Sequence, residues 1–215
     1  MARLIWPLII ISFCFFCNNS YAMETIKLTE PEDTKEVNLK ELLSERKTVR
    51  AFQNKAVPLD VLSYVLWSSY GFKKGGGRVV PSAGALYPLD IYVVMMQGVY
   101  HYLPDTHSLK LVKKGDLRNS IARASLSQMW MAQAPVMLII TVEYRRITGK
   151  YGDRGIRYAL IEAGNVSQNI FLSTIYKGLG CGIVGAFHDD MVKDASGIEK
   201  THEPLLIMPV GYSQQ

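Results

Sequence analysis

Apolar residues recur along the chain at two spacings, one typical of helices and one typical of strands. Intervals of three and four residues place leucine and valine on one side of several segments, which predicts amphipathic helices. The expected helices cover residues 39–45, 59–70, 116–125 and 155–177, and a short one capped by Asp189 or Asp190 that ends at Ala195. Short runs rich in β-branched and aromatic residues predict strands instead. The expected strands cover residues 90–96, 99–103, 109–112, 136–142 and 205–210.

These elements are interspersed without a regular strand–helix–strand alternation. That arrangement predicts an α+β fold in which a mostly antiparallel or mixed sheet is flanked by helices. The chain shows no internal repeat and no linker that would divide it. We therefore expect a single domain over residues 23–215.

The first 22 residues have the features of a secretory signal peptide. Arg3 provides a short positive region, residues 4–17 are apolar apart from Ser12, and small side chains at Ser20 and Ala22 suit cleavage before Met23. A buried N-terminal helix is the alternative, and the proline at position 7 fits it poorly. We expect export, to the periplasm or as a secreted protein. No segment has 18 consecutive apolar residues, so no stable membrane span is expected after cleavage.

Charge and cysteine content narrow the possible partners. The chain has 24 basic and 19 acidic residues, a net charge of +5, and no run of five basic residues, so nucleic acid is not an expected partner. Of its three cysteines, only Cys181 follows the predicted cleavage site. The mature chain therefore cannot form an internal disulfide, and its stability must come from a core, a cofactor or a partner subunit.

A glycine motif near the C-terminus, G-C-G-I-V-G over residues 180–185, matches the dinucleotide-binding pattern G-x-G-x-x-G. That pattern must follow a strand and open a helix early in a strand–helix–strand unit. Here it follows the longest predicted helix and lies close to the C-terminus. The glycines more simply indicate tight packing, or close approach of the backbone to a flat group.

Three polar side chains alternate along a segment expected to be extended. If residues 46–50 are extended, Arg46, Thr48 and Arg50 point the same way, and two guanidiniums with a hydroxyl form a cradle suited to a phosphate dianion. The alternative is a helix end decorated with basic residues, which the spacing alone favours slightly.

Two further segments could carry chemistry. Pro81 to Pro88 combines small residues with two prolines, which would let a planar ring lie against the backbone, but it also fits an ordinary loop. Lys150 and Tyr151 precede a predicted helix and could serve acid–base chemistry, or belong to a solvated basic loop. His188 with two following aspartates more closely resembles a helix cap than a metal site, and no metal is expected.

Taken together and in order, these segments resemble the nitroreductase-like flavoprotein superfamily, and more closely its SagB-type branch of thiazoline/oxazoline dehydrogenases. The resemblance covers roughly residues 39–213. Its motifs are R-K-T-V-R-A-F at 46–52, P-S-A-G-A-L-Y-P at 81–88, G-V-Y-H-Y at 98–102, K-Y-G-x-R-G-x-R-Y at 150–158, E-A-G-x-x-x-Q-N at 162–169, G-L-G at 178–180 and P-V-G at 209–211.

The resemblance implies a nitroreductase-like three-layer sandwich that binds FMN at the subunit interface of a homodimer. It assigns the FMN phosphate to Arg46, Thr48 and Arg50, with Lys47 in the same motif, which raises the phosphate cradle from one of two alternatives to the favoured one. It assigns the isoalloxazine ring to Pro81, Ser82, Ala83, Gly84, Gly185 and Ala186. Lys150 and Tyr151 would be the catalytic pair, as base or proton relay.

The function implied is that of an FMN-dependent oxidoreductase that transfers hydride between a small-molecule or peptide substrate and an acceptor. The alternative is a non-catalytic flavin- or ligand-binding envelope protein that keeps the fold without turnover. A flavin spectrum alone would identify the cofactor, and turnover would separate the two functions.

Overall fold

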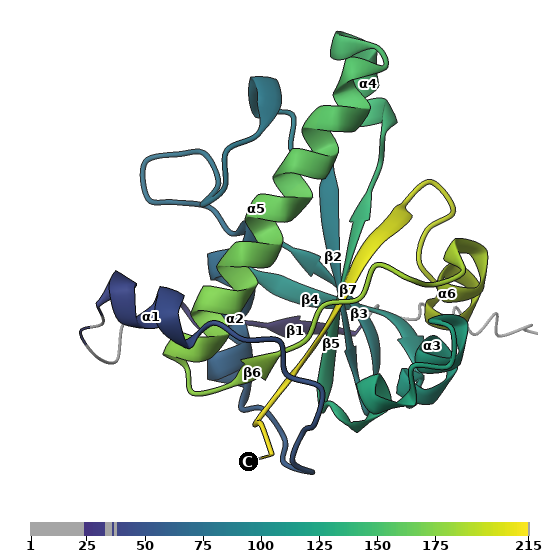
Figure 1. Ribbon diagram of the computed structural model, residues 1–215. Helices are drawn as coiled ribbons and strands as arrows, with labels where there is room; N and C mark the ends of the chain where they lie inside the picture. Colours follow the sequence, from purple (N-terminus) through teal and green to yellow (C-terminus); the bar gives the residue numbers. More distant parts are fainter. Residues whose placement is uncertain (1–23, 33–35, 37, 215) are drawn as a thin grey trace, which may run out of the picture.

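A single antiparallel sheet with helices on both faces organises the chain (Figure 1). The computed structural model describes residues 24–32, 36 and 38–214, so the predicted signal peptide lies outside the described residues. The strands are β1 (Thr25–Lys27), β2 (Leu89–Met95), β3 (Gly98–Leu103), β4 (Ser108–Lys114), β5 (Val136–Val142), β6 (Gly180–Cys181) and β7 (Glu203–Gly211). The helices are α1 (Leu39–Glu45), α2 (Leu59–Tyr70), α3 (Arg118–Ala124), α4 (Arg145–Tyr151), α5 (Arg154–Tyr176) and α6 (Asp189–Ser196), with short 3-10 turns η1 (Ala83–Ala85) and η2 (Met129–Gln133).

The seven strands lie in the order β1-β4-β3-β2-β5-β7-β6, and each neighbouring pair is antiparallel. Strands β2, β3 and β4 follow one another as a meander, whereas β5 and β7 extend the sheet on the other side of β2. In the central pair, Tyr92 lies opposite Ile139. The predicted α+β class with a mostly antiparallel sheet is confirmed.

Alternation along the central strands creates two separate apolar layers. On β5, Leu138 and Ile140 join the cluster that includes α2 and α5, whereas Met137 and Ile139 join the cluster that includes α3 and α6. All seven residues of β5 are buried. Since both faces of the sheet are covered, its strands read as continuous apolar runs, and the molecule has three layers.

Most predicted elements are present within one or two residues, but two helix starts differ. Helix α3 begins at Arg118 rather than at residue 116; Asp116 accepts a hydrogen bond from the Arg118 amide at 3.2 Å and also forms an ion pair with the Arg118 side chain. Helix α6 follows His188, and no side chain caps its first turn; Asp189 and Asp190 lie inside that turn. Both acids still favour the positive end of the helix dipole.

Helix α4 was not expected from the sequence. The segment read as a basic loop forms a seven-residue helix that ends at Tyr151, and Gly152, with a φ of 55°, separates it from α5. Only Ile147 of α4 is buried, so the segment lacks the apolar stripe by which a helix is usually recognised. Among the residues that the structure describes, no helix is both long and apolar enough to cross a membrane.

Candidate functional site

The segment that follows α1 is extended, as the cradle interpretation requires. Helix α1 ends at Glu45, and the backbone of Arg46 is already in the extended region. Thr48 pairs with Cys181 of β6 in a parallel bridge, and the Val49 amide donates to the Cys181 carbonyl at 2.9 Å. The segment therefore lies along β6 like an additional edge strand, with alternate side chains pointing to opposite sides.

Aromatic rings hold the two arginines of this segment. The guanidinium of Arg46 lies 5.5 Å from the ring centre of Phe171, and that of Arg50 lies 5.9 Å from the ring of Trp130. No carboxylate among the described residues pairs with either guanidinium or with Lys47. Cations that are positioned but not neutralised provide the donors that an anion such as phosphate requires.

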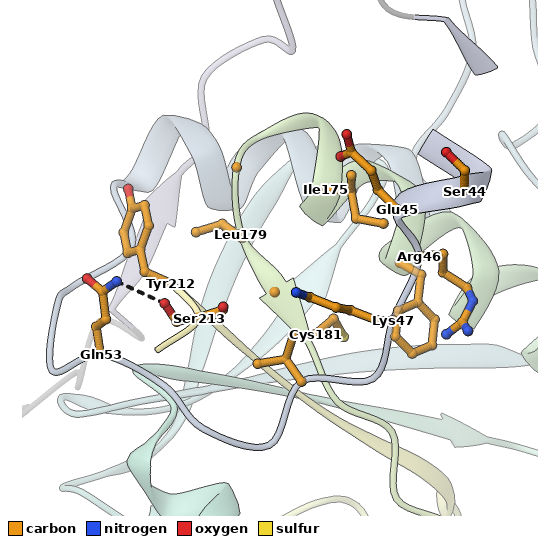
Figure 2. A pocket seen from close by; sticks show the side chains of 14 residues that line it. Ser44, Glu45, Arg46, Lys47, Gln53, Ile175, Leu179, Cys181, Tyr212 and Ser213 are labelled. Atoms are coloured by element: carbon orange, nitrogen blue, oxygen red, sulfur yellow. Dashed lines mark hydrogen bonds between the residues drawn. The ribbon is translucent and has the colours of Figure 1, made fainter. Parts of the chain in front are cut away.

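Lys47 points to the other side of the same segment. It lines a cavity of about 590 Å³ together with Arg46, Val49 and the glycine-rich turn before Cys181. Figure 2 shows the ammonium of Lys47 extending across this cavity, while the guanidinium of Arg46 turns away from it. Thr48 and Arg50 do not line the cavity. The four motif residues therefore serve two adjoining surfaces rather than one.

Close packing accounts for the first two glycines of G-C-G-I-V-G. A β-carbon on Gly180 would lie 2.7 Å from Val49 Cγ2, and one on Gly182 would lie 2.8 Å from both the Trp130 ring and the Val49 carbonyl oxygen. These glycines let β6 approach the cradle segment. The interpretation of the motif as tight packing is therefore confirmed at these two positions.

Gly185 and Ala186 lie in the segment that follows β6, where the packing is more open. Both are exposed, and the nearest atom to a β-carbon on Gly185 would be Leu206 Cδ2, at 3.8 Å. The Ala186 carbonyl accepts a hydrogen bond from the Gln128 side chain at 3.0 Å. Gln128 lies just before η2, which carries the Trp130 ring that contacts Arg50, so one short segment contacts both Ala186 and the cradle.

The loop at 81–88 adopts a tight, partly left-handed conformation on another part of the molecule. Its 3-10 turn, η1, covers Ala83–Ala85, and Gly84 has a φ of 62°. A β-carbon on Gly84 would lie 2.7 Å from the Tyr151 hydroxyl and 3.0 Å from the Lys150 ammonium. The structure thus brings together the glycine of one predicted segment and both residues of another.

Lys150 and Tyr151 lie in the last turn of α4. Lys150 is exposed, Tyr151 is half-buried, and the Tyr151 ring packs edge-on against Tyr158 with centres 5.2 Å apart. Tyr151 therefore does not belong to a fully solvated loop. The hydroxyl and the ammonium both lie beside Gly84, where a flavin ring or a substrate could contact them.

A buried carboxyl adjoins this loop, and no role was assigned to it from the sequence. Glu162 of α5 lines a hollow of about 290 Å³ beside Pro81, Ser82, Ala83 and Tyr158. Only 2% of Glu162 is exposed, and burial raises the pKa of its carboxyl above the ordinary value. The sequence does contain a signal for this residue, because Glu162 is a charged residue within the apolar stripe of the longest predicted helix.

Two separate groups of candidate residues result, at different heights along α5 (Figure 1). The cradle contacts α5 at Phe171, and the Pro81–Ala83 hollow contacts it at Glu162. These residues are nine positions apart on a continuous helix, or about 14 Å along its axis. Within one chain, the cradle forms one group, linked to Ala186 through the segment from Gln128 to Trp130, and Pro81–Gly84 with Lys150 and Tyr151 forms the other.

Comparison with known proteins gives a consistent family. The Nitroreductase family model matches residues 43–212. A Methanocaldococcus jannaschii protein named as a nitroreductase is 40% identical over 195 residues, which cover 87% of this chain and 97% of that protein. A crystal structure of a protein named as a nitroreductase from Ralstonia eutropha superimposes with a TM-score of 0.80 at 28% identity, covering 89% of this chain and 90% of that one.

The microcin B17-processing protein McbC of Escherichia coli is a more distant relative. It is 27% identical over 146 residues, which cover 62% of this chain and 54% of McbC.

The fold expected from the sequence resemblance, an antiparallel sheet between layers of helices, is confirmed by the architecture and by the Ralstonia structure.

Proposed function

Because the chain belongs to the nitroreductase family, we propose that it is an FMN-dependent oxidoreductase that transfers hydride between a small-molecule or peptide substrate and an acceptor. One observation carries the proposal. Two arginines without carboxylate partners among the described residues are held on aromatic rings, and one of these rings, Trp130, lies two residues after Gln128, which binds the exposed backbone at Ala186.

The residues present fit FMN in their chemistry. Arg46, Thr48 and Arg50 supply charged and hydroxyl donors for a phosphate dianion. Exposed backbone without bulky side chains at Gly185 and Ala186 suits a flat ring. Backbone N–H groups near the reactive atoms of a flavin can stabilise charge that develops on reduction.

Bound FMN would supply the acceptance and donation of hydride, and the residues of this chain would supply orientation and protons. Lys150 and Tyr151 present an ammonium and a phenol at the Pro81–Gly84 loop. A side chain at that place can hold a proton or deliver it to a substrate atom. We assign the pair the role of base or proton relay.

We further propose that two copies of the chain complete the site. The cradle group and the Pro81–Gly84 group lie about 14 Å apart along α5 in one chain. The first half of α5, on the N-terminal side of Glu162, exposes three large apolar side chains, Ile156 at 41%, Leu160 at 51% and Ile161 at 57%. A homodimer formed through this face would bury these side chains and set the cradle of one copy against the loop of the other.

The more distant relative supports a proposal for the substrate class. McbC is named for the processing of microcin B17, a role consistent with the SagB-type resemblance of the motifs. On this basis we propose a dehydrogenase that acts on a small heterocycle, free or within a peptide. The chain spans about half the length of McbC. That this chain has the activity of the whole of McbC is therefore a proposal.

An absorption spectrum of the purified protein tests the cofactor. We expect a flavin spectrum and release of FMN on denaturation. We also expect a reductant to bleach the visible absorption of the flavin and a subsequently added electron acceptor to restore it. A protein that binds no flavin after incubation with FMN would overturn the proposal. Flavin binding without turnover towards any acceptor would instead support the alternative, a non-catalytic flavin-binding envelope protein.

Export to the periplasm or the medium remains a proposal based on residues 1–22. N-terminal sequencing of the mature protein is the appropriate test. We expect Met23 as the first residue. An intact Met1 in a cytoplasmic fraction would contradict it.

A further inference from the structure

Glu162 lies beside the start of the loop that precedes β2 and is linked to its end through Tyr70. Its Oε1 atom accepts a hydrogen bond from the Tyr70 hydroxyl at 2.5 Å. That hydroxyl in turn accepts from the backbone amide of Leu89, at 3.2 Å. Since Leu89 is the first residue of β2, the carboxylate fixes the end of the loop through one intervening phenol.

The start of the loop lies beside the same carboxyl group. Ser82 and Glu162 line the same hollow, and the Ser82 hydroxyl lowers the pKa of the Glu162 carboxyl, opposing the effect of burial. The Ser82 hydroxyl oxygen accepts a hydrogen bond from the Tyr87 amide at 2.9 Å, which leaves its hydrogen available to Glu162. Glu162 Oε2 is buried and has no hydrogen-bond partner among the described residues.

The backbone between these two points adopts unfavourable conformations. Ala85 has a φ of 53° and Tyr87 a φ of 47°, in addition to Gly84 at 62°. Residues with a β-carbon rarely adopt this left-handed region, and such a conformation persists only when the surroundings hold it. The restraint must come from contacts at the two ends of the loop and at Tyr87.

Arg78 provides the restraint at Tyr87. Its guanidinium lies 4.2 Å from the ring centre of Tyr70 and 4.9 Å from that of Tyr87. Its backbone amide donates to the Tyr87 hydroxyl at 3.1 Å. Tyr70 is therefore shared: one face contacts Arg78, and its hydroxyl contacts Glu162.

We propose that Glu162 is a positioning residue that, through Tyr70 and Ser82, holds the 82–89 loop in its left-handed conformation and so presents Pro81–Gly84 to the ring of the cofactor. The cofactor part rests on the proposed function. The effect on the loop does not, because every contact in it belongs to this chain.

Amide hydrogen exchange tests the effect on the loop without any ligand. In Glu162→Gln the charge is lost and one of the two oxygens becomes an NH2 group, which cannot accept a hydrogen bond, so acceptors cannot remain at both oxygen positions. We expect the amides of Tyr87 and Leu89 to exchange about 10- to 150-fold faster in E162Q, the change that follows loss of one charge-assisted hydrogen bond. Asp105→Asn, which makes the same chemical change in an exposed turn, should leave them unchanged.

A second measurement reports on the cofactor itself. In the FMN-loaded protein, the visible circular dichroism of the flavin should change in E162Q and in Tyr70→Phe, and stay as in the wild type in D105N. Thermal unfolding of each variant shows that the fold is retained. If E162Q does not fold, Glu162→Asp keeps the charge, shortens the reach by one methylene and gives the same comparison.

The outcomes separate the two proposals. Wild-type exchange at Tyr87 and Leu89 in a folded E162Q or E162D would overturn the role of Glu162, whether or not FMN binds. A wild-type protein that binds no FMN would overturn the proposed function, and the exchange rates would still decide the role of Glu162.

Discussion

The guanidinium of Arg146 lies 2.7 Å from Asp90 Oδ2 and joins the first turn of α4 to strand β2. The same guanidinium contacts Glu143 at 2.6 Å, and the other oxygen of Asp90 lies 2.9 Å from His101 Nε2. His202 lies 3.6 Å from Asp90 Oδ2. Because α4 ends in Lys150 and Tyr151, this cluster fixes the helix that carries the proposed catalytic pair.

The Asp90–Arg146 pair predicts a pH dependence of stability. Burial alone would raise the pKa of Asp90, but the hydrogen bond with His101 and the charges of Arg146 and the histidines lower it below its ordinary value of 3.8. A lowered pKa in the folded state means that the pair stabilises the fold above the ordinary pKa and that this contribution is lost as the pH falls through that value and below.

Asp90→Asn should therefore lower the free energy of unfolding at pH 7 by about 1–3 kcal/mol, the cost of leaving a partly buried charge without its partner. Between pH 7 and pH 3, the variant should lose less stability than the wild type. Urea unfolding at both values measures the difference, with Asp105→Asn as the exposed control. Equal losses in the variant and the wild type would contradict the assignment.

Gly84 is predicted to be intolerant of a side chain. In Gly84→Ala, the alanine would have to adopt a φ of 62°, and its methyl group would lie 2.7 Å from the Tyr151 hydroxyl. We expect a loss of stability of about 1–3 kcal/mol and weaker flavin binding. Gly149→Ala provides the matched control, since nothing lies within 4 Å of a β-carbon in that turn of α4. That control should be neutral or stabilising by up to about 1 kcal/mol; similar losses in both variants would refute the prediction.

The sequence predicted the elements whose own residues determine them. Strand β5 was expected over 136–142 and has those bounds, because an uninterrupted apolar run is buried on both faces. Helix α4 was missed because Ile147 is its one buried residue, so the segment has no apolar stripe. The ion pair of Arg146 with the distant Asp90 also holds the helix, a pairing that no local pattern indicates.

The same limit applies to the candidate site. The alternation of Arg46, Thr48 and Arg50 was visible as soon as the segment was taken as extended. The rings that hold the guanidiniums, Trp130 and Phe171, are more than 75 residues away in sequence, and only the fold brings them there. The close approach of Tyr151 to Gly84 depends in the same way on the packing of α4, so the sequence suggested both residues but not their contact.

The dimer proposal predicts a self-association face on α5. Leu160→Glu places a charge in the centre of that face and should convert the protein from dimer to monomer at micromolar concentration, because a buried unpaired charge strongly opposes association. Met191→Glu, at a similarly exposed apolar position on α6, should leave the dimer intact. Sedimentation of the flavin-loaded protein distinguishes the two. A wild-type monomer, or a dimeric L160E, would count against an interface through α5.

Removing the proposed proton donors should affect turnover and leave cofactor binding largely intact. We expect Lys150→Ala and Tyr151→Phe to lower the turnover number by about 10²- to 10⁴-fold, the range for general acid–base groups, with FMN affinity changed less than threefold, roughly the size of a minor contact. Rapid-mixing measurements separate flavin reduction from reoxidation. Unchanged rates in both variants would show that the pair is not catalytic.

The cradle itself makes the sharpest prediction, because its ligand can be tested with and without a phosphate. Arg46→Ala or Arg50→Ala removes a guanidinium that has no carboxylate partner among the described residues, so the loss falls on the bound anion rather than on an internal ion pair. One charge-assisted contact is worth about 1.5–3 kcal/mol, which corresponds to FMN binding weaker by about 10- to 150-fold. Riboflavin, which lacks the phosphate, should bind these variants almost as well as it binds the wild type.

Lys47→Ala should have a smaller effect, because the Lys47 ammonium extends into the cavity on the other side of the segment. Arg123→Ala, on the exposed surface of α3, controls for net charge. Fluorescence titration with both flavins measures all four variants. Equal weakening of FMN and riboflavin would indicate general loss of structure, and unchanged FMN binding in both arginine variants would place the phosphate elsewhere.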